Sequence, residues 1–460
     1  MKFTKMSLVA ALLVGSSAFA IDNVKVSGDA KLYYTTDDQV HGAGTANPSD
    51  AMFSVANSAG QAALGLGITA DLTKSISAGA HLTALSTLGL EGQLVGNVWE
   101  GTNYLKESFW FDEAWVAGTI GKTTAKVGRM ELDTPLVFTE KWSIAKNTFT
   151  AAVLLNQDIP DTTLVGAYVG QSSGVDLGQN TSGVGIANRV GLSGGGYVAS
   201  GTTTAGAPYS GKDGDSTPFH QFYNGAYAVG AINNSFEPLT VQAWYYDATH
   251  AARAYWLQAD LNMAGFLVGA QYTDLTAEKE LTGAGQDISN DVYAFMLGYS
   301  LKDTVTVKLA YSQTGKATLN GTPAEVGAGF NLATAGTGSA QSKLYTEAWW
   351  NYGYVTRADT SAINLTVEAT VADIDLGAYY TQASVDKNGN VTQAARGYQD
   401  MQEFTLTAGK DFGPLNATLA YIYTQADDQN QNNKNGNLFD ATNGKGKAYN
   451  TVQAYLTLNF

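Results

Sequence analysis

The sequence predicts one closed, antiparallel transmembrane β-barrel of 18 strands. Three observations predict this fold: segments of roughly ten residues alternate apolar and polar side chains, their apolar faces end repeatedly in tyrosine, and short and long connections alternate along the chain. Alternation with a period of two is typical of a strand with one apolar and one polar face. After residue 20 no apolar run approaches the roughly 18 residues that a membrane-spanning helix needs.

The C-terminal segment shows the alternation most clearly. One face carries Val452, Ala454, Leu456, Leu458 and Phe460, and the other carries Thr451, Gln453, Tyr455, Thr457 and Asn459. In further segments the apolar face ends in a tyrosine of the same parity: 24–34, 239–245, 266–272, 305–311, 374–380 and 415–423. At the water boundary of a membrane barrel the lipid-facing residue is preferentially Tyr or Trp. The repeated parity therefore favours a membrane barrel over an exported soluble β-protein.

The expected strands follow one another along the whole chain. They are 24–36, 60–72, 75–88, 109–120, 124–130, 147–157, 162–170, 223–234, 239–249, 253–262, 265–276, 291–302, 305–315, 361–372, 374–385, 402–412, 415–427 and 448–460. The connections 233–238, 262–265, 302–304, 372–374 and 412–414 are short, whereas 35–59, 315–343 and 429–447 are long and polar. This asymmetry matches periplasmic turns and extracellular loops. All eight prolines fall outside the expected strands. Every residue of those strands therefore keeps a backbone N–H that can donate a hydrogen bond to the neighbouring strand. Barrels of this strand number enclose an aqueous channel, so an open pore is expected.

Composition and the N-terminus narrow the class further. Residues 1–20 have the basic start, apolar stretch and small-residue cleavage site of an export signal, which leaves 21–460 as the barrel domain. Without the signal's two lysines, 24 basic residues face 41 acidic ones, a net charge of −17. Such a chain is a poor partner for nucleic acid. The absence of cysteine excludes a disulfide scaffold, a thiolate zinc site and a lipoprotein anchor.

The stretch from Lys126 to Gly170 contains three distinctive motifs: GRMELDTPL at 128–136, NTF at 147–149 and DIPDTTL at 158–164. In these motifs it resembles OprD-type outer-membrane porins, including the related major porins of epsilonproteobacteria. The resemblance implies an 18-stranded barrel whose third external loop, here 131–146, folds inward as a constriction. It also implies a Gram-negative outer membrane with lipopolysaccharide, and insertion machinery that reads the C-terminal strand ending in Phe460. The wider porin class adds a homotrimer.

Strand parity assigns charged side chains to the lumen wall. The bases are Lys25, Lys31, Lys126 and Lys308, and the acids are Asp29, Glu113, Asp260, Glu368, Asp375 and Glu403. The constriction loop adds Glu131, Asp133 and Glu140 against Lys141 and Lys146, with Arg129 at its start as an anchor to the wall. A narrow lumen with an excess of acids concentrates cations. The sequence therefore predicts passive diffusion of small hydrophilic solutes and ions with a weak preference for cations.

Other functions have weaker support. Formal nucleophile-elbow matches at 170–174 and 191–195 lie in a Gly/Ser-rich loop and not between a strand and a helix. The four histidines show no catalytic or metal-ligand spacing, so no catalytic residue, cofactor or metal site is expected. Two alternatives to a general porin stay open. One is a substrate-selective channel for amino acids or small organic acids, and the other is a surface adhesion or structural protein that uses the 171–222 loop.

Overall fold

The protein is described by a computed structural model. It describes residues 21–39, 51–90, 107–141, 144–173, 219–282, 285–302, 304–320, 322–324, 326–334, 340–385, 400–427 and 448–460. The expected export signal, residue Trp142 and most of the 171–222 loop lie outside these residues.

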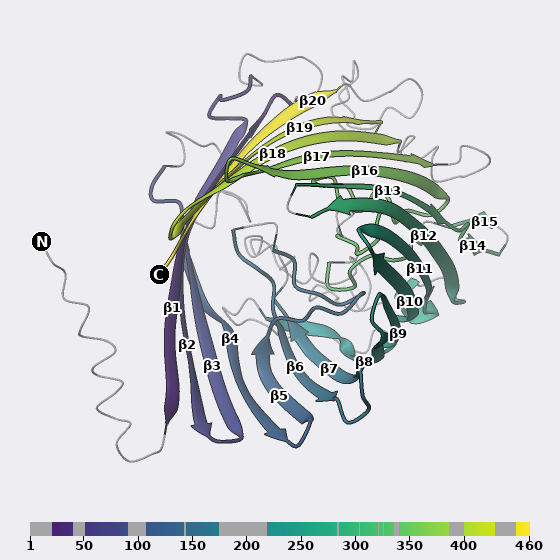
Figure 1. Ribbon diagram of the computed structural model, residues 1–460. Helices are drawn as coiled ribbons and strands as arrows, with labels where there is room; N and C mark the ends of the chain where they lie inside the picture. Colours follow the sequence, from purple (N-terminus) through teal and green to yellow (C-terminus); the bar gives the residue numbers. More distant parts are fainter. Residues whose placement is uncertain are drawn as a thin grey trace, which may run out of the picture.

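The strands form one closed, 18-stranded antiparallel barrel (Figure 1). They are β1 (Asp22–Asp37), β2 (Ser58–Thr73), β3 (Ile76–Ser86), β4 (Glu107–Ile120), β5 (Thr123–Met130), β6 (Phe149–Asn156), β7 (Thr162–Ser172), β8 (His220–Phe236), β9 (Leu239–Ala248), β10 (Ala252–Met263), β11 (Phe266–Ala277), β12 (Ile288–Leu301), β13 (Val305–Thr314), β16 (Thr360–Val371), β17 (Ile374–Val385), β18 (Met401–Phe412), β19 (Leu415–Ala426) and β20 (Tyr449–Asn459). Each barrel strand pairs with its neighbours in the chain. The predicted fold and strand number are confirmed, with every strand boundary within three residues of its prediction.

The first and last strands close the barrel. β1 pairs with β20 from Asp29↔Asn459 to Asp37↔Thr451. The backbone of the terminal Phe460 continues this ladder, since Gly28 N donates to its carbonyl at 2.7 Å and its own N–H donates to Gly28 O at 2.9 Å. Within the described residues, each barrel strand therefore has a hydrogen-bonded neighbour on both sides, so the barrel sheet has no open edge.

The outer face of the barrel is apolar. Along β13, Val307, Leu309 and Tyr311 point outward with exposed fractions of 40%, 53% and 40%. Outward aromatic side chains also pair across strands, as Tyr245 and Tyr255 do with ring centroids 5.0 Å apart. The predicted parity of these tyrosines is therefore confirmed.

Most connections at one end of the barrel are tight turns. The β16–β17 turn places Ala372 and Asp373 in the left-handed region, with φ of 51° and 59°, and the β10–β11 turn does the same with Ala264 and Gly265. Two left-handed central residues match the twist of a hairpin, which explains how two residues can join these strands.

A few short elements lie outside the barrel wall. β14 (Thr318–Leu319) and β15 (Thr322–Pro323) form a small separate hairpin, and α3 (Lys279–Thr282) is one helical turn. No helix in the described part of the chain is long and apolar enough to cross a bilayer. Two longer segments enter the barrel. One is described at 131–141 and 144–148 and follows β5, and the other is described at 326–334 and 340–359 and precedes β16. Figure 1 shows the first crossing the interior.

Candidate functional site

The segment 131–148, here called the first inward loop, begins as a tight hairpin. Asp133 and Phe138 form a bridge, and Thr139 N donates to Leu132 O at 2.7 Å. The Thr134 hydroxyl donates to Val137 O at 2.7 Å and closes the tip. These local bonds satisfy the backbone of a loop that has left the sheet, as buried backbone requires. The predicted third external loop therefore does fold inward.

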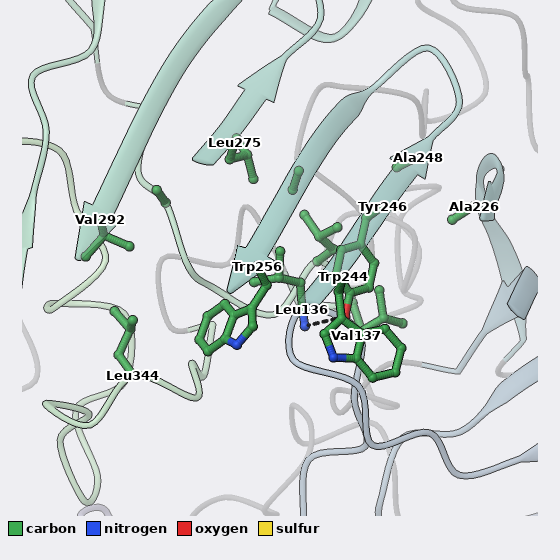
Figure 2. Close-up of a cluster of buried hydrophobic side chains, with 14 of the residues drawn as sticks. Leu136, Val137, Ala226, Trp244, Tyr246, Ala248, Trp256, Leu275, Val292 and Leu344 are labelled. Carbon is green, nitrogen blue, oxygen red and sulfur yellow. Dashed lines mark hydrogen bonds between the residues drawn. The ribbon is translucent and has the colours of Figure 1, made fainter. Parts of the chain in front are cut away.

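The apolar side of the first inward loop packs on the wall formed by β8 to β12. Leu136 is fully buried and Val137 is 4% exposed, and both join a cluster with Trp244, Tyr246 and Trp256 (Figure 2). Leu136 N also donates to the Tyr246 hydroxyl at 3.4 Å. Each fully buried side chain of this size contributes about 1.5–3 kcal/mol. This half of the lumen is therefore filled by packed side chains.

The segment formed by 326–334 and 340–359, here called the second inward loop, holds the first inward loop in position. Leu332 N donates to Leu136 O at 2.8 Å. The Asn331 side chain accepts from Phe138 N at 3.2 Å and donates to Phe138 O at 2.9 Å. Residues 315–343 were expected to form a long external loop, but Asn331 and Leu332 contact the first inward loop instead. The large apolar residues that follow, including the buried Leu344, are the sequence feature that could have indicated this inward packing.

Two carboxylates predicted to line the lumen are buried by these loops instead. Glu140 is 1% exposed and accepts hydrogen bonds from Asn331 Nδ2 at 2.8 Å and Thr334 Oγ1 at 2.6 Å. Glu403 on β18 is also 1% exposed and accepts from the backbone N–H of Trp350 at 3.0 Å and of Asn351 at 2.7 Å. Glu140 connects the two inward loops, and Glu403 connects the second inward loop to the barrel wall. Both were expected to be solvated in the lumen. Strand parity predicts which side chains point inward, but it does not predict which of them a loop covers.

The opposite side of the first inward loop faces an open, charged cavity of about 290 Å³. β1, β2, β3 and β20 form its other wall. Its lining contains the charged side chains of Asp29, Lys31, Glu131, Lys141 and Lys146, together with His81 and the tyrosines Tyr33 and Tyr455. We call this space the charged passage.

Lys146 joins the first inward loop to the wall of the charged passage. Its Nζ lies 2.5 Å from a carboxylate oxygen of Glu113 and 2.5 Å from one of Glu131, and 3.7 Å from Asp112 Oδ2. Burial disfavours the ammonium, but the bonds to Glu113 and Glu131 outweigh it and raise the pKa of Lys146. Lys146 is therefore held charged.

Glu131 has two cationic partners. Lys146 is one, and Lys141, which is two-thirds exposed, forms an ion pair with its other oxygen. Burial opposes the charge of Glu131, yet the hydrogen bonds from both lysines hold its pKa below the usual range. The charges of the passage are thus mutually paired rather than free.

Two further groups in the passage were missed by sequence reasoning. His81 Nδ1 lies 2.7 Å from Asp112 Oδ1, and His81 Nε2 lies 3.7 Å from Asp29 Oδ1. A bulge explains Asp112: on β4, Glu113 pairs with His81 and Phe111 pairs with Leu82, so Asp112 is an extra residue in the ladder. A bulge turns two consecutive side chains toward one face, which simple parity cannot predict.

Three other predicted residues contact the wall or the loops. Arg129 donates to the carbonyl of Phe111 at 3.0 Å, and its guanidinium carbon lies 4.0 Å from the centre of the Phe219 ring. It therefore anchors to a carbonyl and a ring rather than to a charge. Asp133 pairs with Lys343 of the second inward loop at 2.5 Å. Lys126 Nζ lies 4.1 Å from the centre of the Trp115 ring.

The remaining predicted wall residues are spread towards the short-turn end. Lys308 and Glu368 lie 3.8 Å apart, and Asp260 accepts a hydrogen bond from the Tyr345 hydroxyl at 2.5 Å. Asp375, like Glu368, lines a second cavity of about 350 Å³. Lys25 is exposed. These side chains lie apart from the charged passage, whose lining includes none of them.

No protein-family model matches the chain. No curated protein matches it either. Among the described residues, no group of three or more His, Asp or Glu is placed to hold a metal ion.

Solved structures do match over almost the whole length. OccAB1 of Acinetobacter baumannii is 14% identical with a TM-score of 0.67, covering 96% of this chain and 97% of that one. OccK8 (OprE) of Pseudomonas aeruginosa is 12% identical with a TM-score of 0.64, covering 95% and 98%. The outer membrane protein OpdK of Pseudomonas aeruginosa is 11% identical with a TM-score of 0.64, covering 95% and 99%. The chain therefore has the fold of the Occ structures.

Proposed function

We propose that the protein is an OprD-type outer-membrane porin through which small hydrophilic solutes and ions diffuse passively. The observation that carries the proposal is the charged passage, a polar cavity beside an inward loop within a closed barrel whose outer face is apolar. Water and ions need such a polar path, while lipid needs the apolar exterior. The match to the fold of OpdK, a protein described as residing in the outer membrane, supports the same location.

The proposal includes the route to the membrane. Residues 1–20 direct export to the periplasm, and 21–460 form the barrel domain. The C-terminal strand with Phe460 is the segment that the barrel-insertion machinery reads. In the outer membrane of a Gram-negative cell, lipid and lipopolysaccharide surround the barrel, and the assembly is a homotrimer.

The pore prefers cations weakly. In the charged passage itself acids and bases nearly balance, so the preference rests on the wider lumen. There Glu368 and Asp375 line the second cavity, and Lys308 is paired with Glu368. Focusing in a low-dielectric lumen favours K⁺ over Cl⁻ where acids are in excess.

A planar bilayer recording tests the proposed function. The purified mature protein in a KCl gradient is expected to show stepwise openings whose reversal potential lies modestly on the cation side. Folding is verified by heat-modifiability on a gel, because folded barrels resist SDS until boiled. Openings that reverse on the anion side would refute the selectivity alone, and a folded barrel without conductance would refute the porin.

A second candidate within transport is selective uptake of small organic acids. Lys31, Lys141 and Lys146 line the charged passage, and a structure of OpdK was solved with vanillate. Each of these lysines already has a carboxylate partner, which argues for the general porin. Vanillate that blocks K⁺ current at sub-millimolar concentration would favour the selective channel instead.

A further inference from the structure

His81 occupies the centre of a row of charges that crosses the charged passage. The row runs from Lys31 through Asp29, His81 and Asp112 to Lys146, which is on the first inward loop. The His81 side chain retains 19% exposure, so it is in contact with the cavity. Histidine is the side chain whose unperturbed titration falls between pH ~5 and ~8.

Backbone features build this contact. The extra residue at the β4 bulge brings the Asp112 carboxylate to His81 Nδ1, and the Thr148 hydroxyl donates to Asp112 O at 2.7 Å and fixes the bulge. On β2, a Cβ at Gly65 would lie 2.4 Å from Asp29 Oδ1 and 2.9 Å from His81 Nε2. A glycine is thus required there if Asp29 and His81 are to approach each other. β2 presents Gly65 and Gly67 to His81 and contributes no charge.

The state of His81 decides the charge balance of the passage. The groups joined by ion pairs are the carboxylates Asp29, Asp112, Glu113 and Glu131 and the ammonium groups Lys31, Lys141 and Lys146, and Lys126 interacts electrostatically with Glu113, Glu131 and Lys146. With His81 neutral these four carboxylates and four ammonium groups balance, and with His81 protonated the cluster carries one net positive charge. One unit charge a few ångströms from a permeating ion is worth about 0.5–1 kcal/mol even in water.

We propose that His81 is the titratable residue that sets ion selectivity in the charged passage. The inference rests on the proposed porin function and names the group that regulates selectivity there. Protonated His81 adds a net positive charge to the cluster and lowers the preference for K⁺. Neutral His81 leaves the cluster balanced, so the preference for K⁺ rises.

The test measures reversal potential in a KCl gradient from pH ~5 to ~10 for the full mature protein. The wild type is expected to show a K⁺ over Cl⁻ permeability ratio that rises about two- to fivefold with pH. His81→Asn keeps a donor for Asp112 but cannot titrate, and is expected to lose most of this rise. The matched control is His250→Asn in the β9–β10 turn. His250 has a φ of 60°, which asparagine tolerates, and this variant keeps the wild-type rise.

Two other measurements keep the proposal falsifiable. Glu347→Gln removes a buried carboxyl group on the second inward loop whose pKa burial raises to about 8, and this variant should leave the His81-dependent rise intact. Asp29→Asn should displace the midpoint of the rise, which covers the case in which His81→Asn does not fold. An unchanged rise in His81→Asn, an unchanged midpoint in Asp29→Asn, or no rise in the wild type overturns the role of His81 and leaves the porin standing. A folded wild-type barrel without any conductance overturns the porin itself.

Discussion

The two halves of the lumen are built from opposite chemistry. Against β8 to β12 the inward loops bury a packed apolar cluster that includes Leu136, Trp244 and Trp256. Against β1, β2, β3 and β20 the same first inward loop presents Glu131, Lys141 and Lys146 to an open cavity. One loop therefore has a face that closes half of the barrel and a face that lines a passage. Apolar packing fixes the position of the loop, and charge sets what passes beside it.

The largest expected effect on stability and conductance comes from truncating a side chain in the buried apolar cluster. Trp256→Ala removes a fully buried side chain and should cost about 3–5 kcal/mol of stability. We expect the loops to loosen, with a lower melting temperature and larger, noisier single-channel conductance. Leu309→Ala on the outer face of β13 is the control and should leave conductance at the wild-type level. Wild-type conductance and stability in Trp256→Ala would mean that the cluster does not hold the loops.

The second largest effect is on ion selectivity, and it comes from removing the charge of Lys146 in the charged passage. Lys146→Gln leaves Asp112, Glu113 and Glu131 without their shared cation and should raise the K⁺ over Cl⁻ permeability ratio about three- to tenfold. Lys343→Gln removes an equal charge from Asp133, whose side chain is 91% exposed and screened by water. A reversal potential that moves equally in both variants would contradict the special position of Lys146.

A smaller effect separates two glutamates of the same loop. Glu131→Gln removes a charge that lines the passage and should lower the cation preference about twofold. Glu140→Gln removes a buried carboxylate held by Asn331 and Thr334, so we expect weaker loop packing with an unchanged permeability ratio. Reversal potentials of both variants decide the point. The distinction fails if Glu140→Gln shifts selectivity as much as Glu131→Gln.

The smallest effect is a pH dependence of the second inward loop. Burial raises the pKa of Glu347 to about 8, partly offset by a hydrogen bond from Ser342, and its Oε1 has no hydrogen-bond partner. Because the folded pKa lies above the unfolded value of about 4.3, loop stability is highest below that value and falls until pH ~8. Hydrogen exchange of residues 340–359 should therefore quicken between these limits in the wild type. It should stay level in Glu347→Gln, and an identical pH profile in that variant would contradict the assignment.

The sequence predicts the wall of this barrel far better than its interior. Strand boundaries follow from side-chain alternation, which is a local pattern, and each of the 18 strands was found from it. The burial of Glu140 and Glu403 could not be predicted from a local pattern, because it depends on contacts with Asn331 and Asn351, which are far away in the chain. Asp112 was missed because a bulge on β4 shifts parity by one residue, and no local pattern marks that bulge. His81 was not singled out because its partner Asp112 lies on a different strand, 31 residues further along the chain.

The central claim is that the path runs through the charged half and not the apolar half. The chain has no cysteine, so single substitutions report cleanly on access by a water-soluble thiol reagent. We expect such a reagent to reduce the K⁺ current of Thr457→Cys, which lines the charged passage, and to leave Ala254→Cys, fully buried on β10, unaffected. Reduced current at Ala254→Cys with no effect at Thr457→Cys would contradict the account.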